Sequence, residues 1–481
     1  MQLAIKATGE GAKAISFLLA KNPQNLYDRA EKGYRVRLTY TVFTETEVEV
    51  ILFVTPDPVE LVKNSPDAFK ITQYINDREF VVSSLFCSYI RSALGTALNG
   101  RTIEEYLPWV NHAFELNVGF GPVASSPTTE PSPLEDYLEH PHQAFEYYRQ
   151  QGVTTMVVEK KHMGSRAILL LFKDAEVAVD YVGSPTLGTI YTRTGRAFFD
   201  QGMTQTILEQ LNAHLTKAKY FAKHKTDFVL LDAEILPWNL KAKELISAQY
   251  AHVSEVALMD RQKILEKLQL AQGNGWEVNS WLEEYQSKLN SAEVFRDVFQ
   301  KYCWDTNGLE GIKIAPFHVL AHSDRAYFDQ SHCWHMEQNR EFSKLSSLFI
   351  ETEYKVVRDD ISEEEATRWW QEMTENGHEG FVVKPETFIA HNAKGRLIQP
   401  AIKVRGRKYL HIIYGIDYLQ PENLTRLKQR KVGRKQRHAL MEFALGIEGV
   451  RRFVNREPIA QVHECVLATL ALEAEPVDLR L

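Results

Sequence analysis

A stretch rich in proline, serine, threonine and glycine, residues 118–133, interrupts a chain that otherwise has an ordinary globular composition. Residues of these types form turns and extended backbone and contribute few apolar side chains, so the stretch is typical of a linker. The chain of 481 residues is also too long for one ordinary hydrophobic core. We therefore predict a small module over residues 1–107, a linker over residues 108–133, and a larger folded part after it.

After the linker, short apolar runs alternate with turns, which is typical of antiparallel sheets. The runs that predict strands are residues 155–158, 167–172, 176–179, 228–235, 311–320, 379–384 and 401–404. Between residues ~240 and ~305, and again after residue 415, apolar residues recur at helical spacing. We predict an α+β fold class: a core of antiparallel sheets over residues 134–415 with a helical insertion, then a C-terminal helical module over residues 416–481.

The region before the linker has a pattern of its own. Residues 34–43 and 47–54 alternate as two half-buried strands, and residues 80–98 are the most apolar stretch of the chain. Because that stretch carries Ser84 and Arg91, it predicts a core helix and no membrane span. We expect a small α+β module here.

The bulk composition limits the classes of function. A formal net charge of −7 argues against a protein that coats nucleic acid non-specifically, while leaving room for a local basic groove. The four cysteines are scattered and form no Cys-x-x-Cys pair. They favour a reducing cytoplasm over a disulfide framework.

A turn that begins with a lysine is the strongest local sign of chemistry. Lys161 follows the apolar run 155–158 closely, with Gly164 three residues later and Arg166 two beyond the glycine. A lysine amine at such a turn can attack the α-phosphate of a nucleotide and hold the nucleotide covalently. The glycine would let the backbone approach the phosphate, and the arginine would supply a rigid cationic fork.

Residue types that phosphoryl chemistry uses recur near the ends of other predicted strands. They include Glu159, Glu234, Phe317, Glu379 and Lys384. Lys403 and Arg405 occupy alternate residues, which places both side chains on one face of a strand. Arg193 and Arg196 lie in a turn, where guanidinium groups can hold a phosphate by bidentate contacts.

In this order the motifs resemble those of the covalent nucleotidyltransferases, which include ATP-dependent ligases and messenger-RNA capping enzymes and have ATP-grasp-like antiparallel sheets. More closely, residues 132–481 resemble the ligase domain of the bacterial RNA-repair enzyme polynucleotide kinase-phosphatase. The resemblance rests on the run 159–166, where His162-Met163 follows the lysine, and on the run 403–407, where Arg405 replaces a second lysine. Residues 55–62 and 80–84 are similar to the N-terminal part of the bacterial RNA 2′-O-methyltransferase that activates this ligase.

The resemblance implies an ATP-dependent RNA ligase that forms a lysyl-AMP intermediate and then an adenylylated RNA 5′-phosphate, with broken transfer RNA as its target. Lys161 is the implied nucleophile, and Lys384 and Lys403 are the other implied catalytic residues. The implied nucleotide contacts are Glu159, Arg166, Glu234, Phe317, Glu379 and Arg405, the implied Mg²⁺ or Mn²⁺ contacts are Glu234 and Glu379, and the implied RNA contacts are Arg193 and Arg196.

The first chemical step needs an uncharged amine, whereas the pKa of a free lysine is near ~10.4. We expect burial and the nearby cations Lys384, Lys403 and Arg405 to lower the pKa of Lys161.

The chain carries no Walker-type kinase loop, no His/Asp-rich metallophosphatase motifs and no glycine-rich methyltransferase fingerprint. It would therefore seal RNA ends that other repair components, an end-healing kinase-phosphatase and a 2′-O-methyltransferase, have prepared. Residues 1–107 would activate adenylylation, either within one chain or between the chains of a homodimer.

Two alternatives stay open. A capping-type nucleotidyltransferase or a DNA ligase would carry an OB-fold barrel after the last lysine motif, where residues 422–454 have a helical pattern. A non-catalytic RNA-binding scaffold would be expected to have lost at least one charged motif residue, and all are present. The basic run 428–437 fits an RNA track and a solvated helix face equally well.

Overall fold

The computed structural model describes residues 3–7, 36–41, 47–52, 126–192 and 197–457, together with Val462 and Cys465. Before the linker, strands β1 (Leu3–Ala7), β2 (Val36–Thr41) and β3 (Glu47–Leu52) form a sheet in which β1 runs parallel and β3 antiparallel to β2. Strands β2 and β3 lie where the alternation predicts them. The helix predicted over residues 80–98 lies outside the described residues.

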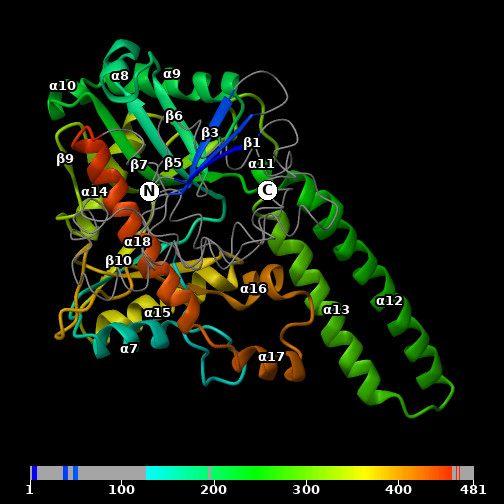
Figure 1. Cartoon of the computed structure of the whole chain (residues 1–481). Coiled ribbons are helices and arrows are strands. Elements are labelled where there is room, and N and C mark those ends of the chain that lie inside the picture. The colour runs from blue at the N-terminus through cyan, green and yellow to red at the C-terminus, as the bar shows by residue number, and fades with distance from the viewer. Residues whose placement is uncertain are drawn as a thin grey trace.

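A four-stranded antiparallel sheet leads into the lysine turn. Its strand order is β10 (Tyr354–Val357), β4 (Met156–Lys160), β11 (Gly380–Pro385) and β12 (Ile402–Arg405). Helices α7 (Pro141–Gln150) and α15 (Asp360–Glu375) lie side by side and pack against one face of it (Figure 1). Phe381 is buried in that layer, whereas Val382 and Lys403 alternate with core residues and line a pocket on the other face.

A five-stranded antiparallel sheet forms the second half of the core. Its strand order is β6 (Gly188–Thr192), β5 (Ser165–Phe172), β7 (Phe228–Leu236), β8 (Lys313–His322) and β9 (Arg325–Ala326). Helices α9 (Gln201–Lys217), α10 (Tyr220–His224) and α14 (His332–Leu345) contribute apolar side chains to its buried cluster. The two sheets confirm the predicted class of mixed helix and antiparallel sheet.

One predicted strand is wrong. Residues 176–179 belong to helix α8 (Ala175–Val182), although their apolar alternation suggested a strand. The side chain of Asp174 caps the helix by accepting a hydrogen bond from the N–H of Val177 (2.8 Å), and Gly183 ends it in the left-handed conformation. Both end signals flank the segment in the sequence and outweigh a short apolar run.

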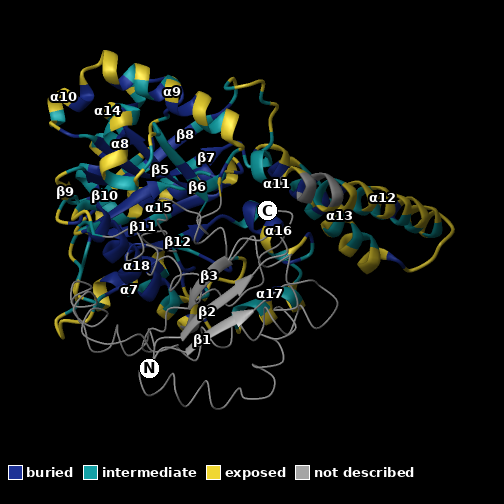
Figure 2. Cartoon of the chain, turned by 45° about the horizontal axis from the view of Figure 1, so that its top comes forward, coloured by how far each residue is buried: buried dark blue, intermediate teal, exposed yellow. Residues whose placement is uncertain are grey.

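The predicted helical insertion is a long hairpin. It contains α11 (Asn239–Leu245), a π-helical turn (Ile246–Ala251), α12 (His252–Gly273) and α13 (Asn279–Gln300). The hairpin projects away from the core (Figure 1), and its outer part is mostly exposed (Figure 2). Its base is held where α13 packs against α16 (Arg407–Tyr414).

The C-terminal segment returns to the core as α17 (Pro421–Lys428) and α18 (Gly433–Val454). Helix α18 contacts strands β8 and β9, so the segment joins the two-sheet core. No helix in the described part of the chain is long and apolar enough to span a membrane.

The end of the predicted linker is part of the core. The N–H of Lys403 donates to the carbonyl oxygen of Pro127 (3.0 Å), and the N–H of Thr129 donates to the carbonyl oxygen of Lys403 (3.3 Å). This extended segment covers the free edge of β12 and satisfies backbone groups that would otherwise lack partners. Thr129 and Ser132 are buried as a result.

Candidate functional site

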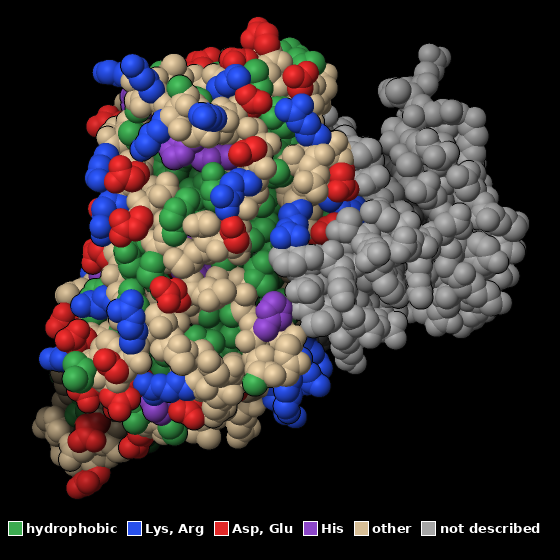
Figure 3. Space-filling view, turned by 90° about the vertical axis from the view of Figure 1, so that its left-hand side faces the viewer, with side chains coloured by type: hydrophobic (Ala, Val, Ile, Leu, Met, Phe, Trp, Pro, Cys, Tyr) green, Lys and Arg blue, Asp and Glu red, His purple; other side chains and the backbone are tan. Residues whose placement is uncertain are grey.

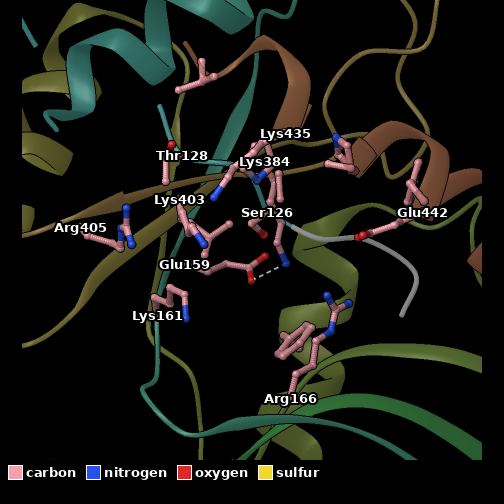
Figure 4. Close-up of a pocket in the computed structure, with 18 of the residues that line it drawn as sticks. Ser126, Thr128, Glu159, Lys161, Arg166, Lys384, Lys403, Arg405, Lys435 and Glu442 are labelled. Atoms are coloured by element: carbon pink, nitrogen blue, oxygen red, sulfur yellow. Dashed lines mark hydrogen bonds and ion pairs between the residues drawn. The ribbon is translucent and has the colours of Figure 1, made fainter. Parts of the chain in front are cut away.

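A pocket of about 890 Å³ lies between the two sheets, with the α17–α18 segment as its third wall. Lysine and arginine side chains outnumber carboxylates along its lining. The predicted site residues among the lining are Glu159, Lys161, Arg166, Glu234, Phe317, Lys384, Lys403 and Arg405 (Figure 4). Glu379 reaches the same site through its contact with Lys161. On the outer face shown in Figure 3, side chains of both signs are interspersed, in contrast to the cationic pocket.

Lys161 follows the last residue of β4, at the turn between the two sheets. Its backbone N–H donates to the carbonyl oxygen of Gly380 (2.9 Å), and its amine donates to Oε2 of Glu379 (3.1 Å). Burial lowers the pKa of Lys161, but the carboxylates of Glu379 and Glu234 outweigh burial and leave that pKa raised. The expected lowering is therefore wrong for the protein without ligands, because two carboxylates act on the amine more strongly than its cationic neighbours.

The lowered pKa expected of Lys161 is found on two other lysines of the pocket. Burial, followed by the charges of Arg405 and Lys161, lowers the pKa of Lys403 to about 7. Burial also lowers the pKa of Lys384, although Glu159 accepts a hydrogen bond from its amine (2.7 Å) and acts in the opposite direction.

Gly164 holds the lysine turn against strand β7. Its N–H donates to Oε1 of Glu234 (3.1 Å). A Cβ atom at Gly164 would lie 2.2 Å from the carbonyl oxygen of Ile235, closer than any side chain permits. The glycine therefore allows the close approach of two protein segments, a role that the sequence did not indicate.

Arg166 and Phe317 form the wall that the second sheet contributes. The guanidinium of Arg166 makes a two-pronged ion pair with the fully buried Asp232, in which Nε lies 2.8 Å from Oδ1. The half-buried ring of Phe317 has the charged groups of Arg166 and Lys384 each 5.4 Å from its centroid. Phe317 is thus part of the pocket wall, between two cations.

Glu139, which the sequence did not single out, organises the far side of the site. It is buried and accepts hydrogen bonds from the backbone N–H of Arg405 (2.9 Å) and from its guanidinium NH2 (2.6 Å). The guanidinium of Arg430 also donates to it (3.0 Å). Burial raises the pKa of Glu139, but Arg405 and Arg430 outweigh it and hold that pKa below its usual range.

The structure brings together all the predicted site residues except two. Arg193 and Arg196 lie outside the described residues. The roles of all these residues stay predictions.

The family model of the PNKP adenylyltransferase domain, ligase domain, matches residues 117–476. The chain belongs to this family. A second model, the RNA repair, ligase-Pnkp-associating, region of Hen1, matches residues 1–131, which reaches beyond the module boundary expected at residue 107. Both matches confirm the resemblances found in the sequence. A comparison with curated proteins finds no match.

Solved structures confirm the fold of this PNKP ligase-family protein. A chain of the Pnkp1/Rnl/Hen1 complex matches with a TM-score of 0.55 and 18% identity over 79% of this chain and 99% of the solved chain. A second structure, of the Pnkp1/Rnl/Hen1 RNA repair complex, gives a TM-score of 0.55 and 17% identity over 78% and 99% of the two chains. These structures show the fold, and the two family models identify the chain as a ligase of RNA repair.

The family implies ATP and a divalent cation, and two carboxylates at the pocket, Glu234 and Glu379, fit the cation. Among the described residues no group of three or more His, Cys, Asp or Glu side chains could hold a metal ion alone. Glu234 and Glu379 both act on the Lys161 amine, and burial together with Glu379 leaves the pKa of Glu234 raised. Two such carboxylates suit a Mg²⁺ or Mn²⁺ ion that takes its remaining ligands from phosphates and water.

Proposed function

We propose that the protein is an ATP-dependent RNA ligase that stores AMP on Lys161 and uses it to seal broken RNA. One observation carries the proposal: the amine of Lys161 lies in a cation-lined pocket between two sheets, 3.1 Å from Glu379. Membership of the PNKP ligase family supports adenylyl transfer as the chemistry.

In the first step, Nζ of Lys161 attacks the α-phosphorus of ATP. A P–N bond forms, the bond from the α-phosphorus to the bridging oxygen breaks, and pyrophosphate leaves. The amine must first lose a proton, and Glu379 already accepts a hydrogen bond from it. Lys403 and Arg405 lie where they could stabilise the charge that builds on the phosphate oxygens. A divalent cation held by Glu234 and Glu379 would supply charge compensation for the phosphates and for the two carboxylates that hold the proton on Lys161.

In the second step, an oxygen of the RNA 5′-phosphate attacks the phosphorus of lysyl-AMP, the P–N bond breaks, and the amine is released. In the third step, the 3′-hydroxyl of the other RNA end attacks that 5′-phosphate and AMP leaves. Arg193 and Arg196 are proposed to hold the 5′-phosphate. Transfer RNA is the proposed substrate, on the ground of the sequence resemblance alone.

We propose that residues 1–107 activate adenylylation. The match of residues 1–131 to a ligase-associating region supports this. The segment at residues 127–129, at the C-terminal end of that match, also pairs with β12 at Lys403. A chain without residues 1–107 should fold and form less lysyl-AMP. Unchanged adenylylation would remove the idea.

We propose that the protein works with other RNA-repair components, an end-healing kinase-phosphatase and a 2′-O-methyltransferase. The similar solved chain belongs to a complex of Pnkp1, Rnl and Hen1, which supports partners of these kinds. Whether the chain forms a homodimer stays a prediction.

The test is covalent labelling with ATP that carries ³²P at the α-phosphate, in the presence of Mg²⁺ or Mn²⁺. Wild type should retain label after denaturation, and Lys161→Ala should not. Lys160→Ala is the matched control, because this neighbouring lysine pairs with Glu353 (3.2 Å) instead of Glu379. Absence of label on folded wild type would favour the scaffold alternative, and label from GTP alone would favour a capping-type enzyme.

A further inference from the structure

The basic run 428–437 contributes part of the pocket wall, although the proposed steps assign it no role. Arg430, Lys431 and Lys435 line the cavity from the α17–α18 segment. Figure 4 shows Lys435 entering the pocket from α18, across from Lys161. The run is therefore more than a solvated helix face.

Arg430 is the most firmly held of these residues. Its NH2 group donates to Oε1 of Glu139 (3.0 Å), and its NH1 group donates to the hydroxyl of Tyr414. Arg405 donates to the same carboxylate and, at 3.3 Å, to the same hydroxyl. Two guanidinium groups from different parts of the chain are thus fixed side by side on one buried anchor.

This anchor leaves positive charge uncompensated. Within the part of the chain that the structure describes, the guanidiniums of Arg405 and Arg430 share one carboxylate, Glu139, and their other shared partner is the hydroxyl oxygen of Tyr414. The Nε atom of Arg430 is buried and has no hydrogen-bond partner among the described residues. A buried cationic group with a spare donor at the wall of a pocket is complementary to an anion with several oxygens.

We propose that Arg430 is a phosphate-binding residue supplied by the C-terminal helical segment, and that Glu139 is the positioning residue that holds Arg430 beside Arg405. The inference rests on the proposed function, because the expected ligand is a phosphate next to the α-phosphate bound at Lys161. That phosphate belongs either to the terminal part of ATP or to the 5′ end of the RNA. The two sources act in different steps and can be measured separately.

The first experiment compares Arg430→Met with Lys428→Met in the full-length protein. Lys428 belongs to the same basic run, but its amine binds the backbone carbonyls of Leu134 and Glu135, and it is not part of the pocket lining. Three rates are measured: label transfer from ATP to the protein, AMP transfer from isolated adenylylated protein to 5′-phosphorylated RNA, and joining of RNA adenylylated beforehand. We expect Arg430→Met to lose about tenfold to about a hundredfold in the first or the second rate, the size of a charge-assisted hydrogen bond.

The rate that falls identifies the ligand. A loss in the first rate assigns the terminal phosphates of ATP, and a loss in the second assigns the RNA 5′-phosphate. Wild-type values for both rates in Arg430→Met would overturn the inference while the proposed function stands, and equal losses in Lys428→Met would also overturn it. If wild type itself takes no label, the proposed function fails first.

The second experiment tests the positioning role of Glu139. Glu139→Gln should raise the KM of the ligand identified above, with a smaller effect on kcat. The double variant Glu139→Gln/Arg430→Met should lose no more activity than the less active of the two single variants. Additive losses would show that Glu139 does not act through Arg430. If Glu139→Gln fails to fold, Arg430→Lys provides the second readout, because it keeps the charge and loses the simultaneous contacts with Glu139 and Tyr414. Full activity in Arg430→Lys would contradict the need for a held guanidinium.

Discussion

The two sheets that enclose the pocket carry charge in different ways. On the four-stranded sheet, the Lys403 amine has a cationic neighbourhood and a pKa of about 7, and Lys161 is held by a carboxylate whose charge the proposed divalent cation would compensate. On the five-stranded sheet, Arg166 is already neutralised by the buried Asp232. Ligand binding can thus change the protonation of the lysines of the first sheet, whereas the ion pair of the second sheet is already complete and forms a fixed wall of the pocket. We infer that the first sheet carries the nucleophile and most of the chemistry, and that the second, apart from Glu234, orients the nucleotide.

The largest expected effect is on the carboxylate that holds Lys161. We predict that Glu379→Gln slows adenylylation by about a hundredfold or more, because it replaces the charged acceptor of the amine and a proposed metal ligand with a neutral amide. In the metal-free protein the same change should lower the pKa of Lys161, since Glu379 raises it. At a fixed alkaline pH, an amine-specific reagent should therefore modify Lys161 faster in the variant. Slower modification of Lys161 together with normal adenylylation in the variant would contradict the role assigned to Glu379.

The lysine turn, which joins strand β4 of the first sheet to strand β5 of the second, offers a structural test of how the two sheets are held together. Gly164→Ala would place a Cβ atom 2.2 Å from a backbone oxygen of strand β7, so the sheets must move apart. We predict a loss of about 1–3 kcal/mol in the free energy of unfolding and a fall in adenylylation of about tenfold. Chemical denaturation measures the first quantity. Gly433→Ala is the control, because a Cβ there meets nothing within 4 Å. Equal stabilities for the two variants would refute the packing role.

The second sheet should affect binding more than rate. We predict that Phe317→Leu raises the KM for ATP by about tenfold, the size of an aromatic stacking contact, and leaves kcat nearly unchanged. Steady-state adenylylation kinetics separate the two constants. A fall in kcat with an unchanged KM would place Phe317 with the catalytic residues and weaken the division between the sheets.

The smallest expected effect is the number of protons that the protein takes up when ATP binds. Lys403, with a pKa of about 7, is mostly uncharged at pH 8, and a bound phosphate should raise its pKa. ATP binding at pH 8 should therefore take up about one proton. Calorimetry in buffers of different ionisation enthalpy measures this uptake. The measurement uses the Lys161→Arg variant, in which no lysyl-AMP can form. The uptake should vanish when Lys403→Met is added, and its persistence would assign the proton elsewhere.

The sequence predicted the features that depend on residues close together in the chain, above all the positions of the strands. Strands β4, β5, β7, β8, β11 and β12 all lie within or next to their apolar runs, because period and turn residues are local signals. The residues of the lysine motifs also meet in one pocket, because both sheets contribute them to the space between the sheets. The helix over residues 175–182 shows the limit, because two capping residues decided it against the apolar pattern.

What the sequence could not give is pairing over long distances. Glu139 binds Arg405 from 266 residues away, and nothing near Glu139 marks it as special. The raised pKa of Lys161 has the same origin, because Glu379 and Glu234 approach it from two different sheets. Both features arise only when the sheets close on each other.

The most direct test of the account is to locate the AMP. Wild-type protein is incubated with ATP and a divalent cation, digested, and analysed by tandem mass spectrometry. We predict the mass of one adenylyl group on Lys161, and none on Lys160, Lys384 or Lys403. An adenylyl group on any of those three lysines, or an unmodified Lys161 in protein shown to join RNA, would contradict the account.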